Sequence, residues 1–127
     1  MAECPFCCLN DQDVICSNEH ALAIYDAFPA SPGHVLIVPR RHLMTTVQAS
    51  QDELVALFAL VPTVQKLLRK CHQIDAFTIG INDGAAAGQT VPHLHLHVIP
   101  RYTGDVADPR GGIRWVLPER ADYWSRT

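Results

Sequence analysis

The chain has 127 residues, a formal net charge of -3 at pH 7, and 48% hydrophobic and 18% charged residues. These values suit one folded domain, expected over residues 1–127, and exclude a disordered chain. No basic excess favours a nucleic-acid partner, and no run of about 18 apolar residues predicts a membrane span. Residues 1–4 lack the basic and apolar parts of a signal peptide, so we expect a cytoplasmic protein.

The first predicted feature is a cysteine knuckle at residues 1–10. Cys4 and Cys7 have the C-x-x-C spacing of a metal knuckle or a redox pair, and Cys8 offers an alternative to Cys7. The chain has five cysteines, an odd number, and a reducing compartment argues against a disulfide framework.

Three strands are predicted next. Residues 14–16 and 21–25 are apolar and flank a plausible hairpin turn at 17–19. A loop with two prolines spans 28–33, and a third apolar strand covers 34–39.

One long helix is predicted from Ser50 to about His72. Ser50 and Glu53 have the spacing of a capping box at its start. Pro62 should kink or divide it, because proline removes a backbone hydrogen bond. The apolar positions recur at helical spacing and predict a buried stripe of Leu54, Leu57, Phe58, Val61, Val64, Leu67 and Leu68.

The last elements are two strands and a tail. A strand at 76–82 precedes a loop of small residues at 83–88, and a histidine-containing strand follows. Residues 103–127 form a predicted loop and tail. Several strands around a single long helix favour an α+β fold, an antiparallel sheet of about five strands with the helix packed on it.

Three histidines alternate with apolar residues in this last strand. Side chains at i, i+2 and i+4 of a strand share one face, so His93, His95 and His97 should line one side while Leu94 and Leu96 enter the core. Imidazole can act as nucleophile, acid, base or metal ligand near neutral pH. The pattern favours a catalytic or metal site over a merely polar face.

The residues before the histidines suit an anion. Gly88, Gln89 and Thr90 bring flexible backbone, an amide and a hydroxyl beside the imidazoles. Backbone N–H groups in such loops bind phosphate without a basic surface.

Two segments resemble a known family. Residues 88–99, GQTVPHLHLHVI, resemble the signature of the histidine triad (HIT) family, and residues 31–42, SPGHVLIVPRRH, resemble its other recurring segment. Within the family, the sequence looks most like the fragile-histidine-triad branch, which cleaves dinucleoside polyphosphates. The residues that carry this likeness are 83–84, 87–91 and 100–101.

The resemblance implies a two-step reaction at the α-phosphate of a nucleotide. His95 would be the nucleophile and form a covalent nucleotidyl intermediate that water hydrolyses. His97 would stabilise the phosphoryl oxygens. Gln89 would contact the transferred phosphate, Thr90 the phosphate or the leaving group, and Asn82 would line the pocket.

The resemblance also implies a nucleoside subsite in the N-terminal half. Asp26 would accept hydrogen bonds from the ribose hydroxyls, although a turn residue after a strand is an alternative. Ile24, Phe28 and Leu36 are candidates for an apolar slot around the base, or else simple core residues. His34 would support the site through a hydrogen bond.

A structural zinc site completes the expectations drawn from the family. Some members bind zinc through two cysteines and two histidines, which here are Cys4, Cys7, His42 and His93. Reduced thiols without metal are the alternative. His20 and His72 match nothing in this pattern and are interpreted as surface residues.

Together these points predict a hydrolase or transferase acting on a purine nucleotide conjugate, as a homodimer. A nucleoside phosphoramidase or phosphorylase on the same scaffold is one alternative. A zinc-stabilised nucleotide-binding module with little turnover is another. The aromatic residues of 114–124 should pack against the partner or the sheet edge, or reach a pocket.

Overall fold

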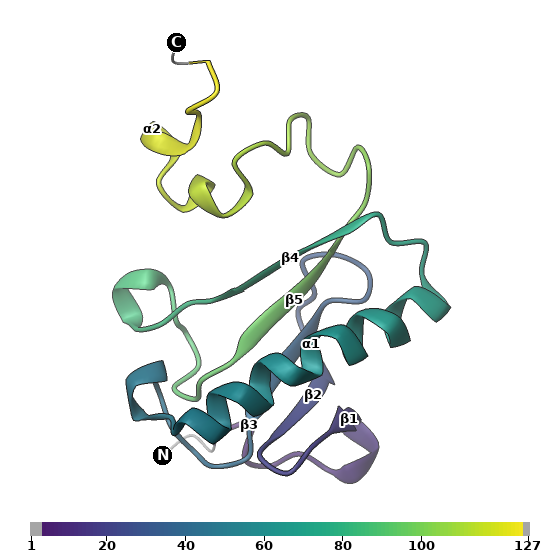
Figure 1. Cartoon of the computed structure of the whole chain (residues 1–127), viewed down its shortest axis with the longest axis vertical. Helices are drawn as coiled ribbons and strands as arrows, with labels where there is room; N and C mark the ends of the chain where they lie inside the picture. Colours follow the sequence, from purple (N-terminus) through teal and green to yellow (C-terminus); the bar gives the residue numbers. More distant parts are fainter. Residues whose placement is uncertain (1–3, 126–127) are drawn as a thin grey trace.

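A five-stranded antiparallel sheet carries the fold (Figure 1). The computed structural model describes residues 4–125, so residues 1–3 of the predicted knuckle and 126–127 of the tail lie outside the described residues. The strands lie in the order β1-β2-β3-β5-β4, which confirms the predicted α+β class. Their bounds are Val14–Ser17 for β1, Ala21–Tyr25 for β2, Val35–Pro39 for β3, Ala76–Ile81 for β4 and Leu96–Arg101 for β5.

The long helix α1, Gln51–Cys71, crosses one face of the sheet (Figure 1). The predicted capping box is present. Ser50 Oγ accepts from Glu53 N–H at 3.1 Å, and the Glu53 carboxylate accepts from Ser50 N–H at 2.9 Å. Arg41 donates two further hydrogen bonds to that carboxylate and lowers the pKa of Glu53 to about 2. Pro62 lies inside α1 without dividing it.

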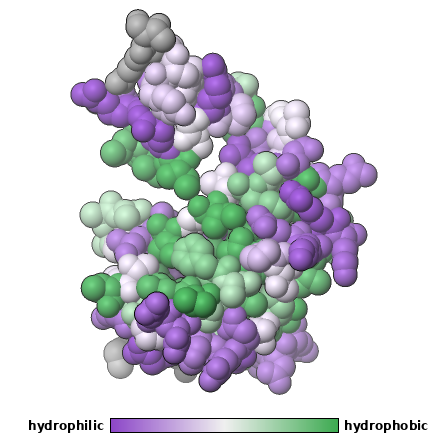
Figure 2. All heavy atoms as spheres, viewed as in Figure 1, coloured by the Kyte–Doolittle hydropathy of each residue, from purple (hydrophilic) through white to green (hydrophobic). Residues whose placement is uncertain are grey.

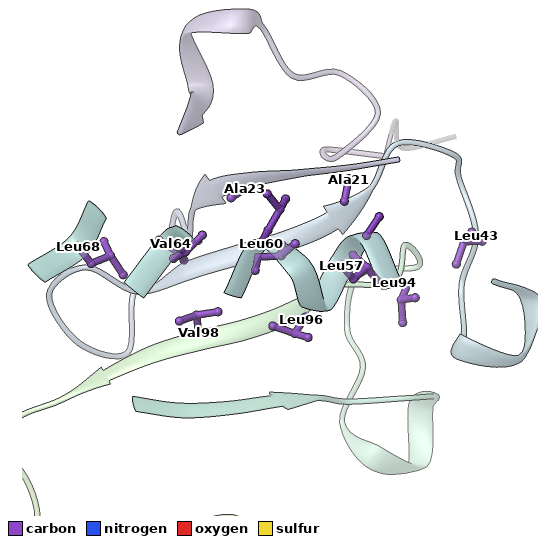
Figure 3. Packing of buried hydrophobic residues seen from close by; sticks show 13 residues of the cluster. Ala21, Ala23, Leu43, Leu57, Leu60, Val64, Leu68, Leu94, Leu96 and Val98 are labelled. Carbon is purple, nitrogen blue, oxygen red and sulfur yellow. The ribbon is translucent and has the colours of Figure 1, made fainter. Parts of the chain in front are cut away.

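The main core lies between α1 and the sheet (Figure 3). Leu57, Leu60, Val64 and Leu68 follow one another at helical spacing and are at most 5% exposed. They pack with Leu94, Leu96 and Val98 of the histidine segment and with Ala21 and Ala23 of β2.

For one residue of the predicted stripe, Phe58, the prediction of burial is wrong. Phe58 is 52% exposed. It follows Leu57 directly, and one residue turns the helix by about 100°. The side chain therefore points away from the sheet, even though its spacing to Leu54 and Val61 suggested burial.

The strand predicted over the three histidines begins later than expected. β5 starts at Leu96, so only His97 belongs to it, whereas His93 and His95 precede it. β3 pairs with β5 only as far as Leu96, which lies opposite Ile37. The inward alternation nevertheless continues before the strand, because Leu94 N–H donates to the Leu43 carbonyl at 2.7 Å.

The opposite face of the sheet carries a second, smaller cluster. Ile24, Leu36 and Val38 are buried there, with Phe6 and Leu9 of the N-terminal segment packed against them. The side of the sheet away from α1 is thus partly covered by the predicted knuckle.

The C-terminal arm, residues 102–125, lies beside the edge strand β4 and extends away from the sheet (Figure 1). It contains the short helix α2, Pro118–Ala121. Ile113 lies against Gly80 of β4. Hydrophobic residues gather on the side of the arm that faces the body (Figure 2), and Val116 and Leu117 remain exposed.

Within residues 4–125, no helix combines the length and apolar character needed to cross a membrane.

Candidate active site

The first part of the site is a cluster of four sulfur and nitrogen ligands. Cys4 Sγ lies 3.3 Å from His93 Nδ1, and Cys7 Sγ lies 3.3 Å from His42 Nδ1. The two Nδ1 atoms are 3.2 Å apart. Zinc with bonds of about 2.0–2.3 Å in a tetrahedron separates its ligand atoms by roughly 3.3–3.8 Å. The spacing of these atoms therefore fits one zinc ion, and the structure brings together the four residues expected to hold it.

His93 is prepared for this role by its other nitrogen. The ring is fully buried, and its Nε2 lies 2.9 Å from the Pro39 carbonyl. A carbonyl only accepts, so Nε2 carries the proton and the lone pair of Nδ1 faces the cluster. Burial lowers the pKa of His93, and neighbouring His42 and His95 add to this effect.

In His95 the proton is on the other ring nitrogen than in His93. Its Nδ1 lies 2.8 Å from the backbone carbonyl of His93, so Nδ1 carries the proton. The Nε2 lone pair is then free to act, and His95 lines the cavity described below. The same carbonyl would stabilise the positive charge that the ring gains when Nε2 forms a bond.

A chain of hydrogen bonds determines which ring nitrogen of His97, the third histidine, carries the proton. Ala30 N–H donates to His34 Nδ1 at 2.9 Å, so Nε2 of His34 carries the proton. This Nε2–H donates to His97 Nδ1 at 2.9 Å. The proton of neutral His97 is therefore on Nε2.

The pKa of His97 agrees with a neutral ring. Burial, with smaller effects from His95 and His34, lowers the pKa of His97 to about 4, and Asp26 opposes them. Burial also lowers the pKa of His34, again opposed by Asp26. A neutral His97 still offers one N–H, which makes it a donor to a phosphoryl oxygen near neutral pH.

Asp26, His34 and His97 form a second group with metal-ligand spacing. Asp26 Oδ2 lies 3.5 Å from His34 Nε2. Since the Ala30 amide occupies Nδ1 of His34, its Nε2 holds a proton and has no lone pair for a cation. The hydrogen bonds thus favour a proton-bearing network here and a metal only at the cysteine cluster.

A cavity of about 660 Å³ lies beside His95 and His97. His95 and His97 form its polar wall together with the predicted residues Asp26, Asn82 and Thr90. The predicted apolar candidates also border it: Ile24 and Leu36 are buried, whereas Phe28 is 90% exposed at the rim. Gly88 and Val91 of the expected phosphate loop border it too, whereas the sequence did not predict the remaining lining residues Pro5, Phe6, Leu9, Asp13, Tyr25 and Ala27.

Phe6 is the most informative of the residues that sequence reasoning missed. Its ring meets His93 and His95 edge-on, with ring centroids 5.6 and 5.4 Å away. The available signal was its place between Cys4 and Cys7, because a knuckle bound to His93 brings the residues between the cysteines close to the histidine segment.

Gln89 lies beside the cavity rather than in its wall. Its Nε2 donates to the carbonyls of Met44 and Val91 at 2.9 and 3.0 Å, and its Oε1 accepts from Gly84 N–H at 2.9 Å. These three bonds to backbone hold the Gln89 side chain in place, and its contact with phosphate stays a prediction. Gly88 has φ +96°, a conformation that glycine adopts at little cost, and here it closes the loop at the cavity wall.

A second attachment holds the same loop. The Asp83 carboxylate accepts from Thr46 N–H at 3.1 Å and from the Thr46 hydroxyl at 2.5 Å. The loop before the histidines is thus fastened to the segment that follows His42.

His20 and His72, interpreted as surface residues, are both partly exposed to solvent. Both are half-buried, and the His72 ring lies against Gly33. Neither borders the cavity.

The sheet order, the single long helix and the histidine-lined cavity define a protein of the histidine triad class. Residues 9–104 match the HIT domain family, and the chain belongs to that family.

Similar proteins support this assignment. The nitrilase and fragile histidine triad fusion protein NitFhit of Caenorhabditis elegans is 38% identical over 92 residues, 72% of this chain and 21% of that protein. A bis(5'-nucleosyl)-tetraphosphatase (asymmetrical) of Schizosaccharomyces pombe is 44% identical over 80 residues, 63% of this chain and 44% of that protein. The chain therefore spans less than half the length of both.

Solved structures agree. The crystal structure of C. elegans NitFhit matches with a TM-score of 0.72 and 34% identity, covering 89% of this chain and 26% of that one. A zinc-bound histidine triad family protein from Mycobacterium smegmatis matches with a TM-score of 0.69 and 34% identity, covering 75% and 69%.

Proposed function

We propose that this protein hydrolyses a purine nucleotide conjugate of the dinucleoside polyphosphate type at its α-phosphate. The observation that carries the proposal is the opposite orientation of two neighbouring imidazoles, a bare Nε2 on His95 and an Nε2–H on His97, in one cavity. One ring can attack phosphorus while the other donates to the oxygens that gain charge. The relatives named a tetraphosphatase and a fragile histidine triad fusion protein support the substrate class.

The first chemical step forms a nucleotidyl-histidine. His95 Nε2 bonds to the α-phosphorus while the bond from phosphorus to the bridging oxygen breaks, and the leaving nucleotide takes that electron pair. The His95 ring becomes positively charged, and its Nδ1–H donates to the His93 carbonyl. His97 Nε2–H donates to a phosphoryl oxygen, which reduces the charge developing there.

The second step returns the enzyme to its starting state. Water attacks the same phosphorus, the bond to His95 Nε2 breaks, and the imidazole recovers its lone pair. A nucleoside monophosphate leaves, and one proton is released to solvent. In this proposal Asp26 binds the ribose, while Asn82 and Thr90 face the phosphates from the cavity wall.

Two further features belong to the proposal. A structural zinc held by Cys4, Cys7, His42 and His93 would leave no open coordination position, so it would support the fold and not the reaction. The thiolates it requires suit a reducing compartment such as the cytoplasm.

A homodimer is the proposed assembly. β4 is an edge strand, bonded only to β5 among the described strands, and apolar Val116 and Leu117 are exposed on the arm beside it. A second copy would pair this edge and cover that patch. Light scattering after size exclusion would test it, and a monomer mass at micromolar concentration would contradict it.

The substrate proposal is tested with diadenosine tetraphosphate in water enriched in oxygen-18. The expected products are AMP and ATP, with one heavy oxygen in AMP, because water attacks the phosphorus carried on His95. Heavy oxygen in ATP alone would contradict attack at the α-phosphate of the transferred nucleotide.

The same assay separates the alternatives. Faster turnover of adenosine 5'-phosphoramidate would indicate a phosphoramidase, and formation of ADP on addition of inorganic phosphate would indicate a phosphorylase. If no conjugate is cleaved and no nucleotidyl-enzyme accumulates, the protein is a binding module.

A further inference from the structure

The metal cluster and the nucleotide cavity share one short segment. Residues 4–9 contribute Cys4 and Cys7 to the ligand cluster and Phe6 and Leu9 to the cavity wall. Phe6 also touches both a metal ligand, His93, and the proposed nucleophile, His95. The same residues that would hold zinc thus carry the apolar side of the nucleoside pocket.

Sulfur–nitrogen contacts attach this segment to the rest of the protein. Residues 5–8 form turns and a bend, with Cys7 N–H donating to the Cys4 carbonyl at 3.1 Å. Across the cluster, Cys4 and Cys7 approach His93 to 3.3 and 3.5 Å. An ion bonded to all four ligands would convert these approaches into a covalent-strength crosslink between distant parts of the chain.

Without an ion the cluster lacks the metal–sulfur bonds that would hold residues 4–9 to the two histidines. The Nδ1 atoms of His42 and His93 lie 3.2 Å apart, and the Nδ1 of His93 is unprotonated because its proton is on Nε2. His42 can donate a proton to this nitrogen, so the two rings can form a hydrogen bond without an ion. Cys4 and Cys7 then keep only weak sulfur–nitrogen contacts, and residues 4–9 can move away. A segment that moves away takes Phe6 and Leu9 with it and opens the cavity on that side.

We infer that metal binding at the cysteine–histidine cluster completes the wall of the nucleotide cavity, so that metal loading sets the affinity for nucleotide. This inference rests on the proposed function, because it assumes that a nucleotide binds in the cavity. If only a tenth of the metal-free molecules have the wall closed, the apparent affinity falls about tenfold. The coupling is reciprocal, so bound nucleotide tightens metal binding by the same factor.

The first experiment compares zinc-loaded protein with protein stripped by a chelator, using AMP as the probe in calorimetry. We expect AMP to bind at least about tenfold more weakly to the stripped protein, while circular dichroism shows that its sheet and helix persist. Competition with a chromophoric chelator should then show zinc held about tenfold more tightly when AMP is saturating.

One variant tests the cavity wall while leaving the metal ligands unchanged. Phe6→Ala keeps all four ligands, so we expect one zinc per chain but AMP binding weakened about tenfold. We also expect AMP to have little effect on its zinc affinity. Val47→Ala removes apolar atoms from a side chain that is 89% exposed and outside the cavity, and it should behave as wild type.

Two results would overturn the inference. One is a folded, stripped protein that binds AMP within twofold of the zinc-loaded form. The other, which decides the question if the stripped protein unfolds, is zinc-loaded Phe6→Ala with wild-type AMP affinity. Failure of the zinc-loaded wild type to bind AMP or cleave any conjugate would refute the proposed function itself.

Discussion

His34 and His97 share one proton at a separation of 2.9 Å between Nε2 and Nδ1. The donor is His34, because the Ala30 amide occupies its other nitrogen. A backbone N–H thus determines, through one intervening ring, which nitrogen of His97 faces the cavity as a donor. His34 is buried and does not line the cavity, so it acts on the site by positioning.

Replacing His34 should impair the chemical step more than substrate binding. In His34→Phe no donor reaches His97 Nδ1, so the His97 proton can move to Nδ1 and the donor to phosphate is lost. We expect kcat to fall about 100-fold with KM changed less than about threefold. His34→Gln retains an N–H donor at this position and should recover much of kcat. Equal losses in both variants would contradict the role in proton placement.

The metal cluster yields a paired prediction for adjacent cysteines. Cys7 lies within reach of both ligand histidines, whereas Cys8 is not part of the cluster. Cys7→Ser should lose most bound zinc and lower Tm by more than about 10 °C, because ligation contributes to folding. Cys8→Ser should keep one zinc per chain, measured by elemental analysis. Zinc loss from Cys8→Ser would reassign the ligand.

The sequence predicted well where alternation, helical spacing or a short motif constrained the chain. The period of two placed Leu94 and Leu96 in the core, although the regular strand begins only at Leu96. The alternation did not reveal that the three histidines separate. His93 turns to the cysteines and His95 to the cavity, because each ring follows its own hydrogen-bond partner.

Other features depended on contacts between distant segments. Phe6 and His95 are far apart in sequence, and their contact exists only because the cysteines return to His93. The hydrogen-bond partners of Gln89 were also beyond the pattern, because they include the Met44 carbonyl, 45 residues away. No local rule predicts which backbone groups a loop leaves for a side chain to satisfy.

Gln89 should therefore behave as a residue that shapes the loop. Gln89→Ala frees the Gly84 amide and the carbonyls of Met44 and Val91, so we expect kcat/KM to fall about tenfold. Asp83→Ala provides the comparison, because it removes the other attachment of the loop, to Thr46, from outside the cavity. The two variants should agree within about threefold. A loss in Gln89→Ala more than 100-fold larger would indicate direct contact with phosphate.

Stability should fall on acidification, partly through His97. Its folded pKa of about 4 lies below the unfolded value near 6.5, so the unfolded chain binds the extra proton first. No penalty exists above pH 6.5. Between pH 6.5 and 4 the penalty grows, and it reaches about 2 kcal/mol near pH 5. Urea unfolding at pH 7.5 and 5.0 measures it.

His97→Asn isolates this contribution from those of other titrating groups. His34 also has a lowered pKa, and the metal ligands bind protons in the same range, so the wild type alone does not identify the source. We expect the variant to lose about 2 kcal/mol less stability than wild type between the two pH values, with zinc content matched in both. Parallel losses would show that His97 is protonated in the folded protein at pH 5, and would remove the basis for its role as a neutral donor.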